Sequence, residues 1–299
     1  MLIADRKAGN LRGARRFPVL MLLAGCALAE DSYFRAKAAF EAGQFEAALG
    51  WIGKLAPEEA SRPAAQNLKS LALAELGRYP EALEASARAR ELDPQNQHYI
   101  YNAALILMSK GELAEAEQTF GRALERFPRS TVLHNGLGET LLRLNRFEDA
   151  EQALRKSVEI DPGAAQAQVL LARLYYALGE RGKLGQAAAR ALERAPNDHQ
   201  ACYYYGLWLM DYEHREQEGA AWVEKSIQMA PQFVDGLKSW GQWLARRNQW
   251  REAAKAFERA RSLAPRDAQL VYLLATAERK AGNRAAADEL LKRYRGLAR

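Results

Sequence analysis

The side chains that most often perform catalysis or bind metals are few and widely spaced in this sequence of 299 residues. Two metal ligands share one face of a helix when they lie three or four residues apart, and no two of the four histidines do so. No glycine-rich loop follows a strand-like segment, so a phosphate-binding loop is not indicated either. We therefore expect no enzyme activity, no metal and no cofactor, and no small-molecule substrate is evident.

The net charge likewise gives no indication of a nucleic-acid partner. The formal charge of the chain is +6, but residues 1–25 hold five basic residues and one acidic residue, which leaves only +2 for the rest. Binding to nucleic-acid phosphates requires a dense basic surface. With catalysis, metal binding and nucleic-acid binding not indicated, the function left to consider is recognition of another molecule through many weak contacts. Such recognition depends on the secondary-structure elements that position the side chains.

Those elements are indicated by six prolines at nearly constant spacing. They are Pro94, Pro128, Pro162, Pro196, Pro231 and Pro265. The intervals between them are 34, 34, 34, 35 and 34 residues. Proline lacks a backbone N–H and clashes with the preceding turn, so each proline ends a helix at the same point of a repeated unit.

A second regularity divides each unit into two helices. Glycine or asparagine lies seventeen residues before five of the six prolines, and both tolerate the left-handed backbone that closes a helix. The exception is His214, in the interval with the extra residue, which we expect within 211–219, between two helices. One further position is small in every unit, which predicts close approach of two helix backbones there. Its occupants are Ala36, Ser70, Ala104, Gly138, Ala172, Gly206, Gly241 and Ala275.

This pattern resembles the tetratricopeptide repeat (TPR), a 34-residue pair of antiparallel helices. The copy that agrees best is Val234–Asp267, with the signature residues Gly241, Leu244, Ala253, Phe257, Ala260 and Pro265. Eight copies fit the sequence, beginning near residues 29, 63, 97, 131, 165, 199, 234 and 268. The resemblance implies an all-α fold over residues 29–299, a TPR solenoid of about eight helix-turn-helix repeats forming a superhelix.

The resemblance also implies where a partner binds. In this family the concave surface is lined mainly by the first helix of each repeat, at positions 2, 5, 9 and 12. The central repeats place there Tyr101, Leu105, Met108, Asn135, Glu139, Leu142, Val169, Arg173, Tyr176, Tyr203, Leu207 and Met210. These mostly apolar side chains suit a helix or an extended peptide, with Glu139 and Arg173 setting its register. The alternative is that several of them face neighbouring helices and belong to the core.

Residues 1–28 lie outside the repeats and predict an export signal. A basic stretch precedes the apolar run 17–25, which is shorter than the roughly 20 residues of a membrane-spanning helix. The run ends in Leu23-Ala24-Gly25-Cys26, which resembles the lipobox of bacterial lipoproteins, in which cleavage leaves a lipid on Cys26. The other interpretation is ordinary secretory cleavage after Ala29. With either cleavage Cys202 is the one remaining thiol, and we expect it to be buried.

These observations favour a protein–protein interaction scaffold whose partners are proteins or peptides. We expect a lipid-anchored protein of the bacterial cell envelope, because Ala27 after the lipobox cysteine implies the periplasmic side of the outer membrane. Such a protein would assist assembly of a multiprotein machine for pilus formation, secretion or polysaccharide export. Two alternatives are a soluble periplasmic holdase or carrier for peptides and a regulatory adaptor of an envelope enzyme.

Overall fold

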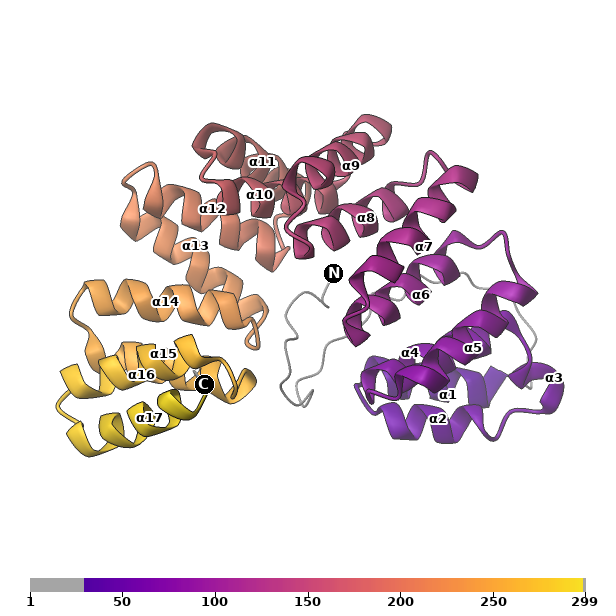
Figure 1. Ribbon diagram of the computed structural model, residues 1–299, viewed down its shortest axis with the longest axis horizontal. Helices are drawn as coiled ribbons and strands as arrows, with labels where there is room; N and C mark the ends of the chain where they lie inside the picture. The colour runs from indigo at the N-terminus through magenta and orange to yellow at the C-terminus, as the bar shows by residue number, and fades with distance from the viewer. Residues whose placement is uncertain (1–29, 298–299) are drawn as a thin grey trace. The chain divides into compact units, whose positions relative to one another are not determined.

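The computed structural model describes residues 30–297, and all regular structure in this range is helical (Figure 1). The predicted export signal and lipobox, residues 1–28, lie outside the described residues. The predicted all-α array of about eight helix-turn-helix repeats is confirmed, because the seventeen helices within residues 30–297 form eight pairs with one short additional helix. No helix within 30–297 combines the length and the apolar character needed to cross a bilayer.

Each pair consists of a first and a second helix. The first helices are α1 (Glu30–Glu41), α4 (Pro63–Glu75), α6 (Gln97–Lys110), α8 (Thr131–Arg143), α10 (Ala165–Leu178), α12 (His199–Asp211), α14 (Val234–Arg246) and α16 (Ala268–Lys280). The second helices are α2 (Phe45–Ile52), α5 (Tyr79–Leu92), α7 (Leu113–Arg126), α9 (Phe147–Ile160), α11 (Arg181–Arg194), α13 (Glu216–Met229), α15 (Trp250–Leu263) and α17 (Arg284–Leu297). The sequence did not indicate α3 (Pro57–Ala60), a single turn between the first two pairs.

Local hydrogen bonds explain where several first helices begin. The Asp198 carboxylate accepts hydrogen bonds from the backbone N–H of Gln200 at 2.9 Å and of Ala201 at 2.8 Å. Asp267 caps α16 in the same way. These side chains satisfy N–H groups that have no partner within the helix, and the proline two residues earlier keeps the preceding helix from continuing.

The turn inside each pair requires one residue in the left-handed region. These residues are Gly43, Gly77, Gly111, Asn145, Gly179, His214, Asn248 and Gly282. His214 therefore adopts the same left-handed conformation as the glycines and asparagines, with φ of 54°. In the sequence it was the exception to the pattern of glycine or asparagine at this place. The predicted extra residue of the sixth repeat lies in its turn, residues 212–215.

Small residues allow the paired helices to approach closely. A Cβ atom added to Gly241 on α14 would lie 2.5 Å from the Phe257 ring on α15, so the phenylalanine fills the space that the glycine leaves. The equivalent residues Ala36, Ser70, Ala104 and Ala172 are fully buried. The prediction of close backbone contact at this position is confirmed.

The described chain divides into two compact units, residues 30–170 and 171–297. In unit 1 the second helices α5 and α7 pack against the first helices on both sides, and α4 and α6 also pack against the next first helix, α6 and α8 respectively. An amide hydrogen bond of 3.0 Å from Asn102 to Asn67 joins α6 to α4. The largest fully buried side chains of this unit include Leu73, Ile106 and Phe120.

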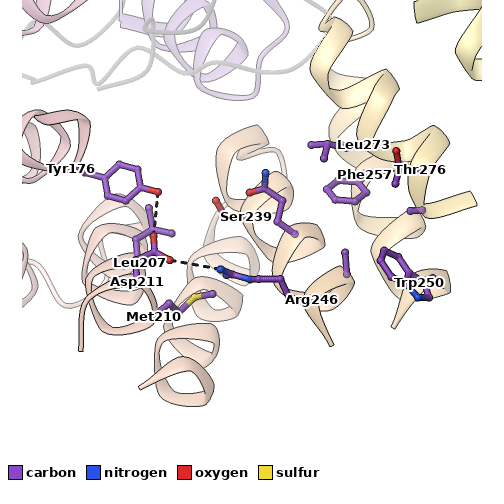
Figure 2. A pocket seen from close by; sticks show the side chains of 13 residues that line it. Tyr176, Leu207, Met210, Asp211, Ser239, Arg246, Trp250, Phe257, Leu273 and Thr276 are labelled. Atoms are coloured by element: carbon purple, nitrogen blue, oxygen red, sulfur yellow. Dashed lines mark hydrogen bonds and ion pairs between the residues drawn. The ribbon is translucent and has the colours of Figure 1, made fainter. Parts of the chain in front are cut away.

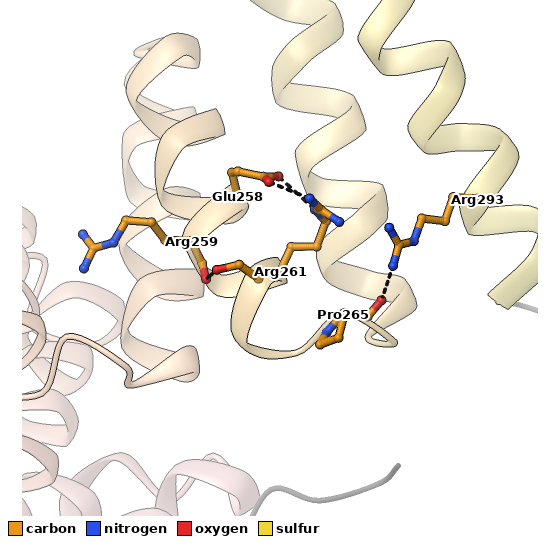
Figure 3. A network of polar contacts seen from close by, with 6 residues as sticks. Glu258, Arg259, Arg261, Pro265 and Arg293 are labelled. Carbon is orange, nitrogen blue, oxygen red and sulfur yellow. Dashed lines mark hydrogen bonds and ion pairs between the residues drawn. The ribbon is translucent and has the colours of Figure 1, made fainter. Parts of the chain in front are cut away.

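In unit 2 a basic side chain on each of three second helices, α13, α15 and α17, contacts the preceding repeat. Lys225, Arg259 and Arg293 donate hydrogen bonds to the carbonyl oxygens of Pro196, Pro231 and Pro265, at 3.5, 3.3 and 3.0 Å. Figure 3 shows the last of these contacts beside the ion pair of Arg261 with Glu258. Proline at this point thus both ends a helix and presents a carbonyl that joins one repeat to the next.

Candidate peptide-binding groove

The twelve residues predicted to line a concave surface are divided between the two units. Unit 1 contains Tyr101, Leu105 and Met108 on α6, Asn135, Glu139 and Leu142 on α8, and Val169 on α10. Unit 2 contains Arg173 and Tyr176 on α10, and Tyr203, Leu207 and Met210 on α12. Nine of the twelve are buried, and only Tyr101, Arg173 and Tyr176 are half-buried.

Three of these residues line a cavity in unit 2. It has a volume of about 500 Å³, and its walls come from α10, α12, α14, α15 and α16 (Figure 2). We call it the unit 2 groove. The predicted residues in it are Tyr176, Leu207 and Met210. The other residues that line it are Asp211, Ser239, Gln242, Ala245, Arg246, Trp250, Phe257, Leu273, Thr276 and Ala277.

The register of the repeats explains most of this lining. Leu207, Gln242 and Thr276 all occupy position 9 of consecutive repeats, and Tyr176, Met210 and Ala245 all occupy position 12. The sequence prediction used these positions only up to the sixth repeat, so it missed the groove residues of the seventh and eighth repeats. Continuing the same two positions along the chain would have found Gln242, Ala245 and Thr276.

The floor of the groove is apolar. Leu207, Met210 and Phe257 are at most 6% exposed, so their side chains form a closed surface with little access to water. Trp250 and Leu273 are half-buried beside them and offer apolar surface to a ligand. The apolar surface of Trp250 and Leu273 favours an aliphatic or aromatic side chain of a partner, because binding removes apolar surface from water on both sides.

The rim of the groove is polar and holds one charge of each sign. The Tyr176 hydroxyl donates a hydrogen bond of 3.4 Å to Asp211, and an Arg246 guanidinium nitrogen lies 3.9 Å from the other carboxylate oxygen (Figure 2). Burial and then the charge of Asp211 raise the pKa of Tyr176 to about 12, so the hydroxyl remains a donor at neutral pH. Because Asp211 and Arg246 are partly exposed, their ion pair adds little stability and both can exchange partners with a ligand.

Tyr203, which was also predicted to line the concave surface, joins two repeats through its contacts. Its hydroxyl lies 3.0 Å from the Ser239 hydroxyl, and its ring makes edge contacts with Tyr204 and Phe233. The neighbouring Tyr205 instead packs against Trp222 on α13. The aromatic residues of α12 are therefore distributed over several faces of the helix, as their spacing requires.

Reactive groups do not gather in the described residues. Cys202 is fully buried, as predicted, and burial raises the pKa of its thiol. Within 30–297 no three side chains of His, Cys, Asp or Glu are arranged to hold a metal ion. The absence of enzyme activity stays a prediction.

Comparison with known proteins shows the family. A sequence model of the tetratricopeptide repeat matches residues 33–97, 101–165, 137–199 and 239–299, and the chain belongs to this family. In sequence it is similar to the CTR9 homolog of Arabidopsis thaliana, with 23% identity over 245 residues, which are 79% of this chain and 22% of that protein. The chain spans about a quarter or less of the curated relatives it matches.

Solved structures agree on the fold. A tetratricopeptide repeat protein from Parabacteroides merdae has a TM-score of 0.63 at 17% identity, over 83% of this chain and 98% of that one. Yeast Tom70 has the same TM-score and identity, over 96% of this chain and 64% of that one. At these identities the likeness concerns the fold alone. Proteins of this family serve as scaffolds for protein–protein interaction.

Proposed function

We propose that this protein is an interaction scaffold that holds a short segment of a partner protein in the unit 2 groove. The observation that carries the proposal is the cavity of about 500 Å³ with an apolar floor and a polar rim. Its volume falls within the roughly 300–1,000 Å³ typical of ligand sites, which suits a few side chains of a segment.

The lining indicates how such a segment is held. Its apolar anchor lies against Trp250, Leu273 and the buried floor. Gln242 is half-buried and forms no hydrogen bond within the described residues, so its amide is available to a backbone N–H and C=O of the ligand. Asp211 and Arg246 give the rim opposite charges, which orients the segment in one direction.

Site-specific photocrosslinking in cells tests this proposal. A photoreactive amino acid at Gln242 is expected to capture one protein through one segment, whereas the same group at Lys255 on the exposed side of α15 is not. The captured segment, made as a synthetic peptide, should then bind the purified chain. Capture of the same protein from Lys255 but not from Gln242 would show that the groove is the wrong surface.

We also propose that the protein is a lipid-anchored component of the bacterial envelope, on the periplasmic side of the outer membrane. The support is the sequence Leu23-Ala24-Gly25-Cys26 at the end of an apolar run, within residues that the structure does not describe. In this setting the bound segment belongs to a machine for pilus formation, secretion or polysaccharide export. A soluble periplasmic protein would result from cleavage after Ala29.

Replacing Cys26 with serine is expected to abolish lipid labelling and to move the protein from the membrane fraction to the soluble fraction. The thioether that carries the lipid cannot form without the thiol. Metabolic labelling with a fatty-acid analogue, followed by fractionation, measures both effects. The matched control is Cys202→Ser, which removes a buried thiol and should keep the label. A C26S protein that stays labelled and membrane-bound would contradict the anchor.

A further inference from the structure

Basic side chains gather at the end of the unit 2 groove, where the first helices finish. Asp211, Arg246 and Lys280 are the last residues of α12, α14 and α16 and occupy position 13 of their repeats, and the first two line the groove. The Lys280 ammonium nitrogen lies 5.9 Å from the centroid of the Trp250 ring, which also lines it. Arg279 occupies position 12, from which each of the three preceding repeats contributes a lining residue. We call Arg246, Arg279 and Lys280 the basic cluster.

The basic cluster keeps hydrogen-bond donors available to a ligand. The side chains of Arg279 and Lys280 are exposed and form no ion pair and no hydrogen bond with any residue of 30–297. Arg246 approaches Asp211 at 3.9 Å, which is too long for a hydrogen bond, and 56% of its side chain is exposed. Because a guanidinium group carries five N–H donors, Arg246 can meet a second carboxylate without leaving Asp211.

Acidic side chains do not offset this charge inside the groove. Of the described residues that line it, Asp211 is the one acidic residue, and its carboxylate also accepts the hydrogen bond of Tyr176. The acidic residues nearest in sequence to the end of the groove are Glu252 and Glu278. Neither lines the groove, and neither forms an ion pair with a described residue. An excess of positive charge therefore lies beside the apolar surface of Trp250.

The geometry points to an acidic ligand: we propose that the segment held in the unit 2 groove has an apolar anchor flanked by aspartate or glutamate residues, whose carboxylates pair with the basic cluster. This inference rests on the proposed function and names the chemistry of its segment. Arg246 belongs to α14 and the other two cations to α16, so carboxylates at two points of a segment match them. The single carboxylate of a chain end supplies one such point.

The charges and the anchor contribute differently to binding. Exposed ion pairs are individually weak, so the apolar anchor supplies most of the affinity. The basic cluster instead selects among segments, because it attracts acidic residues and repels basic ones. An acidic segment also approaches the groove faster than a neutral one, since opposite charges steer the encounter.

Selection from a library of short random peptides displayed on phage, with the purified full chain as target, tests the ligand chemistry. We expect the selected sequences to be enriched in aspartate or glutamate close to an aliphatic or aromatic residue. The most enriched sequence is then made with fluorescein at its N-terminus and an amide at its C-terminus, together with an isostere in which Asn and Gln replace Asp and Glu. The isostere should bind about tenfold more weakly, the effect expected of losing two exposed ion pairs.

Three results would overturn the acidic ligand. They are selected sequences without acidic enrichment, equal affinity of the peptide and its isostere, and binding that requires a free terminal carboxylate. Salt gives an independent measurement with the same two peptides. Raising the ionic strength from about 0.1 M to about 1 M shortens the Debye length from roughly 10 Å to roughly 3 Å. The affinity difference between the two peptides should shrink accordingly, and a difference that salt does not change would contradict ion pairing.

The double variant Arg279→Gln with Lys280→Gln locates the charges that matter. It should weaken the acidic peptide by about tenfold and leave the isostere unchanged. The matched control, Lys292→Gln with Arg295→Gln, removes the same charge from the exposed surface of α17. Lys292 lies eight residues beyond the first residue of α17, or roughly 12 Å along the helix axis. Equal losses in the two double variants would show an effect of net charge and refute pairing at the groove.

The variant Thr276→Trp, which fills the groove, separates this inference from the proposed function. If the selected peptides lose binding to T276W but show no acidic enrichment, the acidic ligand is wrong and the scaffold function of the groove stands. If acidic peptides bind T276W as tightly as the wild type, the groove is the wrong surface and the proposed function fails with the inference.

Discussion

Replacing Gly219 with alanine is expected to lower the free energy of unfolding by about 3 kcal/mol, a large fraction of the stability of a domain. The added Cβ would lie 2.5 Å from the Gly206 carbonyl oxygen and 2.9 Å from the Met210 backbone nitrogen. These are backbone atoms of α12, so no rotamer change relieves the clash and the two helices must separate. Gly206 faces the same contact from the other side, with its own added Cβ 2.7 Å from the Gly219 oxygen.

Urea-induced unfolding followed by circular dichroism measures this effect. Gly182→Ala is the matched control, because Gly182 lies on α11 in the same unit and an added Cβ meets no atom within 4 Å. Alanine there should raise stability by about 0.5 kcal/mol through its better helix propensity. Gly241→Ala should cost less than G219A, since its neighbour is the Phe257 ring, which can shift. Equal midpoints for G219A and G182A would refute the backbone contact between α12 and α13.

Filling the unit 2 groove with Thr276→Trp is expected to weaken binding of the crosslinked partner peptide by about 100-fold, the loss typical of a central hot-spot residue. Thr276 is half-buried in the groove, and its hydroxyl donates a hydrogen bond of 2.9 Å to Tyr272 in its own helix. Removing the Thr276 hydroxyl therefore leaves no hydrogen-bond acceptor on another helix without its donor. The indole would occupy the space that the peptide anchor needs.

Fluorescence anisotropy of the labelled peptide measures this change. Thr119→Trp is the control, because Thr119 makes the same kind of hydrogen bond, 2.8 Å to Glu115, on α7 in unit 1. Its substitution should leave peptide affinity and melting temperature close to those of the wild type. If T276W binds the peptide as tightly as T119W, the segment does not lie in the groove.

Part of the unit 2 groove can be predicted from the sequence. The family resemblance implies that positions 9 and 12 face inward, and Leu207 at position 9 and Tyr176 and Met210 at position 12 line the groove. The 34-residue period makes the same side of the first helix recur in each repeat. The period does not state how far apart neighbouring first helices lie. A cavity opens where the side chains between them leave space, and that depends on all the helices packed around it. Arg246 and Trp250 became groove residues only in the folded chain.

The backbone conformation of His214 and the burial of Glu139 also could not be predicted from the residue type alone. Histidine has no intrinsic preference for positive φ, yet the turn between α12 and α13 imposes a φ of 54° on it. Glutamate is normally solvated, yet Glu139 on α8 is only 5% exposed.

The sequence by itself therefore determined the helix pairs, their turns, their length and the face of each that recurs. These features follow from local physics: proline stops, left-handed turn residues and the 3.6-residue period of a helix. Only the tertiary structure decided which inward side chains belong to the core and which surround a cavity. Those outcomes depend on distances between helices, which no single repeat encodes.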